Sequence, residues 1–184
     1  MTTFVVAAFG ILIALCTLTA ILWSVASPRR RIWPPQHYSD WITPIVVWVP
    51  TFTLAGSLVW LGIDGWNELA LPSWLRWGVG MPIIVIANLA VWSEVARFGM
   101  RQTGGAAGPL RTDGLYRWSR NPQYVADIAM VAGWLLLSAS FYALPVGFLA
   151  IAVLLAAPFA EERWMEDRHG DPWRAYVATV RRFV

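Results

Sequence analysis

The sequence is poor in the residues from which disulfides and metal sites are built. It has one cysteine and two histidines in 184 residues. A single cysteine cannot form an intrachain disulfide, and with two histidines it gives no metal-ligand cluster of recognisable spacing. Neither a P-loop nor a GxGxxG fingerprint is present, which argues against the nucleotide-binding folds of soluble proteins. We expect no metal and no nucleic-acid partner.

Charged residues are also scarce. They make up 14% of the chain, whereas 58% is hydrophobic, far more than in an ordinary soluble domain. The stretch from Phe4 to Val25 contains no charge, and about 20 apolar residues are enough to cross a bilayer. A cleaved signal peptide would have a basic start and an apolar run of only ~7–15 residues. The sequence therefore predicts a permanent transmembrane helix, with Cys16 inside it.

Four more apolar segments follow, at roughly 41–63, 77–95, 124–141 and 142–160. The last two share 37 residues, and about 17 residues of helix reach only roughly 25 Å, so they should form a tight hairpin. The expected fold is all-α, with five transmembrane helices in one structural domain. Residues 1–98 would form a three-helix part, and residues 99–184 a core of loop, hairpin and C-terminal interfacial helix.

The chain contains no lysine, and its fourteen basic residues are all arginine. Basic residues favour cytoplasmic loops. Arg29, Arg30 and Arg31 follow the first span, and with five spans thirteen of the fourteen arginines fall on the same side. This distribution predicts a multi-pass protein with its N terminus outside and its C terminus in the cytoplasm. The polar loop before the hairpin and the polar tail after it would then meet at the cytoplasmic face, where we expect the active site.

The stretch "SRNPQY", residues 119–124, precedes the hairpin. Asn121 suits the cap of a helix and Pro122 its first turn. Asp127 lies one turn beyond Tyr124, and an ionisable residue at that depth is a functional candidate, although pairing with an arginine explains it equally well. Glu161 and Glu162 follow the last span, so either the helix continues or one carboxylate faces inward toward a cationic partner or a ligand.

Taken together, "GPLRTDGLYRWSRNPQY", the hairpin, "EERWM" and "HGDPWRAYVATVRRF" resemble the C-terminal half of the isoprenylcysteine carboxyl methyltransferase and phospholipid methyltransferase family. The resemblance covers about residues 108–183. Its members are membrane-embedded enzymes that use S-adenosylmethionine. Asn121 stands where the family usually has a histidine, and His169 replaces a phenylalanine. The apolar "LLAAPFAEE" lacks the arginine that serves the carboxylate of a prenylcysteine substrate.

The resemblance implies a cofactor pocket for S-adenosylmethionine, a cation with a carboxylate and an adenine. Such a ligand needs an acidic group, N–H donors and apolar walls. The cofactor-binding residues implied by the family motifs are Gly108, Pro109, Leu110, Arg111, Tyr116, Asn121, Pro122, Gln123, Tyr124 and Glu162.

The acceptor would be a lipid or another lipophilic small molecule, of isoprenylcysteine or phospholipid type, that reaches the site from the membrane. Glu161 or Asp127 could take a proton from an amine acceptor, and Arg120 could hold a phosphate or carboxylate, so these three are the candidate catalytic residues. Two alternatives remain open: an NADPH-dependent membrane reductase of the sterol reductase type, and a non-catalytic membrane subunit. The oligomeric state is not indicated.

Overall fold

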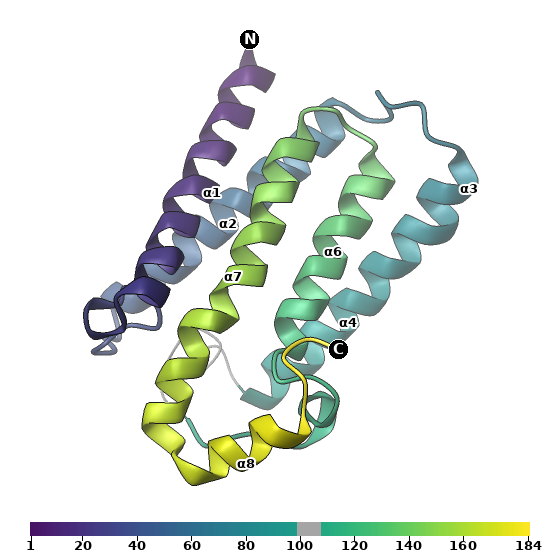
Figure 1. Cartoon of the computed structure of the whole chain (residues 1–184). Helices are drawn as coiled ribbons and strands as arrows, with labels where there is room; N and C mark the ends of the chain where they lie inside the picture. Colours follow the sequence, from purple (N-terminus) through teal and green to yellow (C-terminus); the bar gives the residue numbers. More distant parts are fainter. Residues whose placement is uncertain (99–107) are drawn as a thin grey trace.

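A computed structural model describes residues 1–98 and 108–184, and every regular element within them is a helix (Figure 1). The glycine-rich stretch 99–107, at the start of the expected cytoplasmic loop, lies outside the described residues. Six long or medium helices set the architecture: α1 (Thr2–Ala26), α2 (Ile42–Asp64), α4 (Met81–Phe98), α6 (Pro122–Ser138), α7 (Ala143–His169) and α8 (Asp171–Thr179). Short turns of helix join them: η1 (Pro28–Arg30), α3 (Ser73–Leu75), η2 (Arg76–Gly80) and η3 (Gly114–Arg117).

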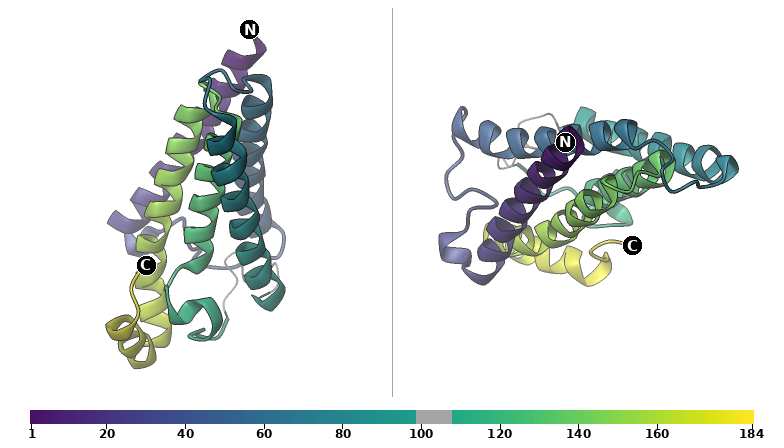
Figure 2. Two further views of the ribbon diagram at one scale, coloured as in Figure 1. Left: turned by 90° about the vertical axis from the view of Figure 1, so that its right-hand side faces the viewer. Right: turned by 90° about the horizontal axis from the view of Figure 1, so that it is seen from above.

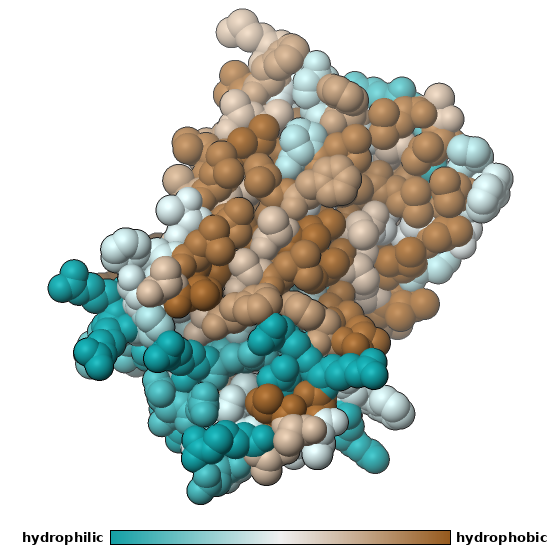
Figure 3. Space-filling model, viewed as in Figure 1, coloured by the Kyte–Doolittle hydropathy of each residue, from teal (hydrophilic) through white to brown (hydrophobic). Residues whose placement is uncertain are grey.

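Within residues 1–98 and 108–184, four helical stretches are long and apolar enough to cross a membrane: Thr2–Ala26, Ile42–Asp64, Ser73–Arg97 and Ala143–His169. They fit a multi-pass integral membrane protein. The fifth expected span corresponds to α6, which has 17 residues and is not among the four. Figure 3 shows a broad hydrophobic surface over the helices and a hydrophilic end below it. The count of five spans therefore stays a prediction.

The helices form two contacting groups. Helix α7 packs against α1, α2 and α6, and α6 packs most extensively against α4. The interior is built from small and aliphatic residues, such as Ala7, Leu61 and Val146. Small side chains permit this close packing, because a Cβ on Gly147 would come within 2.6 Å of Leu135. Such packing is typical of membrane helices, whose association does not benefit from the hydrophobic effect.

The end of the bundle that holds the N terminus and the α6–α7 turn is called here the far end (Figure 1). Its segment 65–76 covers the last turn of α6: the Asn67 N–H donates to the Ser138 carbonyl at 2.7 Å, and Arg76 Nε donates to the Leu137 carbonyl at 2.8 Å. The Arg76 guanidinium also lies 4.5 Å from the centroid of the Trp66 ring. These contacts satisfy carbonyls that a helix end leaves unpaired.

At the opposite end, called here the site end, α7 continues nine residues beyond the expected boundary at Ala160 and stops at Gly170, whose φ is +57°. The apolar span was expected to end near Ala160, and the sequence left open whether the helix continues beyond it; the helix does continue through Glu161 and Glu162. The sequence after Ala160 is rich in Glu, Arg and Met, which are good helix formers. Helix α8 then turns back (Figure 2), and the C-terminal tail is hydrogen-bonded to Arg120 and Asn121, just before α6.

Candidate functional site

At the site end, Glu161 of α7 is held by two neutral donors from distant parts of the chain. The indole N–H of Trp33 donates to Oε1 of Glu161 at 2.7 Å, and the Tyr124 hydroxyl makes a short hydrogen bond to the same oxygen. Trp33 comes from the loop after α1, and Tyr124 from the first turn of α6. No hydrogen bond or ion pair from a described residue reaches Oε2 of Glu161. The carboxylate therefore has no cationic partner among these residues.

Its neighbour Glu162 is in the opposite situation. Arg182 donates two hydrogen bonds to Glu162, from Nε to Oε1 at 2.8 Å and from Nη2 to Oε2 at 2.7 Å. Arg120 Nη1 lies 3.1 Å from Oε1 of the same carboxylate. The Arg182 guanidinium also lies 4.0 Å from the ring centroid of Phe159. Hydrogen bonding to Glu162 raises the pKa of Arg182, so the arginine stays charged. Glu162 is therefore paired with two arginines, whereas the adjacent Glu161 has no cationic partner among the described residues.

Asn121 and its neighbours bind the C-terminal tail. The Asn121 side-chain amide donates to the Arg182 carbonyl at 3.0 Å, the Ser119 hydroxyl donates to the same carbonyl at 3.3 Å, and the Arg120 N–H donates to the Arg181 carbonyl at 2.9 Å. Asn121 does occupy the residue before α6, and Pro122 begins the helix, but the Asn121 side chain makes no capping bond. Asn121 thus occupies the N-cap position as expected, but the expected capping hydrogen bond from its side chain is absent, and its amide group donates to the tail instead.

This arrangement leaves donors free at the start of α6. Pro122 has no N–H, and neither Gln123 nor Tyr124 donates its backbone N–H to a described residue. Asn121 is different, since its N–H donates to the Ser119 hydroxyl at 3.0 Å. Unpaired N–H groups at a helix N terminus attract anions such as a carboxylate.

A second aromatic group lies beside this end of α6. Tyr116 of η3 has a raised pKa, chiefly because it is buried and then because Glu94 and Glu161 carry negative charge nearby. Its carbonyl accepts a hydrogen bond of 2.6 Å from the Tyr176 hydroxyl of α8. Burial likewise raises the pKa of Tyr176 to about 12. Glu94 of α4 is 2% exposed, and Arg97 Nη1 lies 3.5 Å from its Oε1.

The remaining expected site residues are less tightly placed. Asp127 is half-buried in α6, one turn after Tyr124, and makes no hydrogen bond or ion pair with a described residue. Gly108, Pro109, Leu110 and Arg111 form an irregular segment before η3. Their part in a pocket stays a prediction. Arg120 faces Glu162 and is nearly buried, with a side chain 10% exposed.

Two residues at the centre of this geometry did not emerge from the sequence motifs. Trp33 stands next to the arginine cluster of the first loop, where a tryptophan is explained as a membrane-interface residue. Arg182 lies within the quoted tail motif, but nothing in its spacing assigns it to Glu162. A contact between residues 33 and 161 is a product of the tertiary fold, so only the co-variation of homologous sequences could have indicated it.

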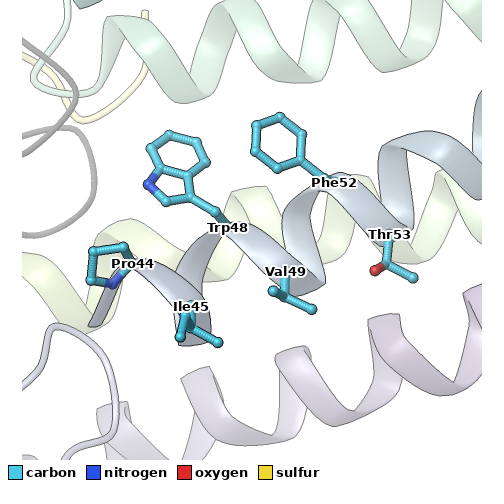
Figure 4. Close-up of a pocket in the computed structure, with 6 residues that line it drawn as sticks. All are labelled: Pro44, Ile45, Trp48, Val49, Phe52 and Thr53. Atoms are coloured by element: carbon cyan, nitrogen blue, oxygen red, sulfur yellow. The ribbon is translucent and has the colours of Figure 1, made fainter. Parts of the chain in front are cut away.

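Two of the hollows on the surface of the described residues differ in their chemistry. One, of about 460 Å³, is bounded by α7, α8 and the tail, and its lining includes Arg120, Glu162, Arg182, Phe159 and Trp173. The other, of about 420 Å³, is a shallow groove on α2, lined by Pro44, Ile45, Trp48, Val49, Phe52 and Thr53 (Figure 4). The groove contains no titratable group, whereas the first hollow adjoins the arginine–glutamate cluster.

Comparison with known proteins gives a match over the middle and C-terminal part of the chain. The sequence profile of the phospholipid methyltransferase family matches residues 75–171, just over half of the chain. A steroid 5-alpha-reductase, DET2 of Solanum lycopersicum, is 24% identical over 101 residues, a match that spans 54% of this chain and 39% of that relative. The chain therefore matches about two fifths of the reductase's length. No solved structure gives a significant match.

The family match contains α4, η3, α6 and the whole of α7, with Tyr124, Glu161 and Glu162 among its residues. Two of the three quoted sequence motifs, "GPLRTDGLYRWSRNPQY" and "EERWM", lie within it, and the third begins at its end. These observations agree on one assignment: the chain belongs to the phospholipid methyltransferase family.

Proposed function

We propose that the protein is an integral membrane methyltransferase that binds S-adenosylmethionine at the site end and methylates a membrane-associated amphiphile. The observation that carries the proposal is Glu161, a carboxylate fixed by two neutral donors and left without a cation among the described residues. Such a group favours a positively charged ligand, because the ligand provides the cationic partner that the carboxylate lacks.

The residues at the site end fit this cofactor. S-adenosylmethionine contributes an activated methyl group on a sulfonium, together with an ammonium and a carboxylate. Glu161 can balance positive charge, and the unpaired N–H groups of Gln123 and Tyr124 can receive a carboxylate. Tyr116 and Tyr124 offer aromatic walls. In this division of roles Glu162 is a structural residue that joins α7 to the tail, although the sequence motifs place it in the pocket.

Catalysis by this chain would depend chiefly on position. Holding two reactants in line supplies much of the rate of a transfer reaction, so few acid or base residues are needed. For an amine acceptor, a carboxylate must accept the proton that the nitrogen loses. Asp127 and Glu161, both close to the start of α6, have no cationic partner among the described residues and could do so. We propose that the acceptor enters from the bilayer and the cofactor from the cytoplasm.

The reductase relative favours a second candidate function, the reduction of a lipid with NADPH. That ligand carries several phosphates, which require cations. Arg120 and Arg182 are already paired with Glu162, and the adjacent Glu161 has no cationic partner among the described residues. This arrangement supports the methyltransferase over the reductase.

Calorimetric titration of the detergent-purified protein with S-adenosylhomocysteine, with NADPH in a parallel titration, tests the proposal. We expect binding of the first ligand alone. Glu161→Gln should weaken it roughly 10- to 100-fold, the effect of losing one charged hydrogen-bond partner, while the thermal midpoint changes little. Binding of NADPH alone would assign the protein to the reductases, and binding of neither would favour a non-catalytic subunit.

A further inference from the structure

We infer that Trp33 is a positioning residue of the cofactor site, which acts by fixing the carboxylate of Glu161. The inference rests on the proposed function. Trp33 lies in the loop after α1, outside the residues 75–171 that match the family. It would therefore be a contribution of the N-terminal helices to a site whose other motifs belong to the C-terminal half.

The geometry at Glu161 shows what Trp33 does. Its indole N–H and the Tyr124 hydroxyl both donate to Oε1, and they approach from different elements. Two donors on one oxygen fix the rotation of the carboxylate about its last bond, and the charge left on Oε2 is directed at a third partner. With Tyr124 as the sole donor, the carboxylate could rotate and exchange its oxygens. Trp33 thus restricts the rotation of the Glu161 carboxylate before the ligand binds, so binding loses less conformational entropy.

The backbone of Trp33 is hydrogen-bonded to the end of α1. The hydroxyl of Ser24, which is 2% exposed, accepts the backbone N–H groups of Ile32 at 2.9 Å and Trp33 at 3.0 Å, and it donates to the Ala20 carbonyl at 2.7 Å. All three bonds are made near the end of α1, so the loop cannot move without breaking them. The Trp33 backbone therefore has a fixed place relative to α1.

The Trp33 ring is fixed as well. Together with Tyr124 it packs against a buried cluster made by Ile21 of α1 and Val153, Ala157 and Ala160 of α7. The ring thus lies between the helix that anchors its backbone and the helix that carries Glu161. A half-buried indole that packs on both helices and donates its N–H to a carboxylate is pre-organised, and a lipid-exposed belt tryptophan is not.

The test is titration of Trp33→Phe with S-adenosylhomocysteine and with sinefungin, an analogue that has an amine in place of the sulfonium. Phenylalanine keeps an apolar ring and loses the N–H. We expect affinity for S-adenosylhomocysteine to fall about 10-fold and affinity for sinefungin to fall further, because the second ligand adds a cation. A merely structural loosening of the loop would weaken both ligands equally and would overturn the inference.

Trp23→Phe is the matched control. Trp23 lies in the same region, and its indole N–H also donates to an oxygen, the Arg30 carbonyl at 3.1 Å, but that bond is exposed and does not involve Glu161. The control should bind both ligands like the unaltered protein. A loss as large as that of Trp33→Phe would show a general effect of the loop and would count against the inference.

A double variant distinguishes action through Glu161 from any other route. In a Glu161→Gln background, Trp33→Phe should cause little further loss, and equal losses in both backgrounds would overturn the inference. If Trp33→Phe does not fold, Ser24→Ala decides: weaker binding at an unchanged thermal midpoint supports the inference, and unchanged binding refutes it. If the unaltered protein binds neither ligand, the proposed function fails and this inference with it; if it binds both and Trp33→Phe binds equally, the inference alone fails.

Discussion

Arg182 binds Glu162 through two nearly parallel hydrogen bonds, of 2.8 and 2.7 Å, and the same residue's carbonyl accepts from Asn121. One residue near the C terminus thus joins α7 to the start of α6. Both helices contribute to the surroundings of Glu161. The geometry of the candidate site therefore depends on a tail that lies beyond the family match.

Removal of the Arg182 side chain should destabilise the protein. Arg182→Leu leaves Glu162 with Arg120 as its partner, and the loss of a charged, partly exposed pair should cost about 1–2 kcal/mol in the free energy of unfolding. Arg181→Leu is the control, because the Arg181 side chain is exposed and makes no ion pair with a described residue, and it should cost less than about 0.5 kcal/mol. Thermal unfolding in detergent measures both, and equal midpoints would contradict the prediction.

Asn121 offers a test of tail binding against helix capping. Neither serine nor alanine can extend an amide to the Arg182 carbonyl, so Asn121→Ser and Asn121→Ala should each lose about 1 kcal/mol. A capping asparagine would behave differently, because serine caps a helix nearly as well as asparagine does. Unfolding measurements on the two variants separate these roles. A silent serine variant with a destabilised alanine variant would restore the capping interpretation.

The helical segments and their order could largely be predicted from the sequence, because long apolar runs specify membrane helices by composition alone. The end of α7 could not, since Glu161 and Glu162 are polar yet remain helical where partners and a favourable sequence allow it. The sequence motifs predicted Tyr124, Glu161 and Glu162 as residues of the site. Their separate roles depend on Trp33 and Arg182, which approach from sequence distances of 128 and 20 residues.

Two glycines set the contact between η2 and α6 at the far end. A Cβ on Gly80 would come within 3.0 Å of the Leu137 nitrogen and 3.1 Å of the Gly133 carbonyl, both backbone atoms that cannot rotate away. Gly80→Ala should therefore separate the helices and cost about 1–3 kcal/mol. Gly78→Ala, two residues earlier with no atom within 4 Å of its Cβ, should be neutral or slightly stabilising. Similar thermal midpoints for both variants would refute this packing.

Tyr176 should make stability sensitive to alkaline pH. Burial raises its pKa from the ordinary 10.0 to about 12, so the folded protein holds the phenolic proton more tightly than the unfolded chain does. Its stabilising contribution is complete below about pH 10 and is lost as the pH rises toward 12. Tyr176→Phe should lower the midpoint at neutral pH, because the bond to the Tyr116 carbonyl is lost, and should show a shallower decline above pH 10. Parallel alkaline slopes would contradict this linkage.

The orientation of the bundle can be tested by cysteine labelling in a background without the exposed Cys16. The arginine distribution predicts that the site end faces the cytoplasm. Ser73 at the far end and Trp118 at the site end are both exposed, whereas the neighbouring Ser119 is only 6% exposed and hydrogen-bonded, so it would label poorly. An impermeant maleimide added outside intact cells should modify Ser73→Cys and spare Trp118→Cys until the membrane is opened. Labelling of Trp118→Cys alone would reverse the topology, and with it the side from which a cytoplasmic cofactor could enter.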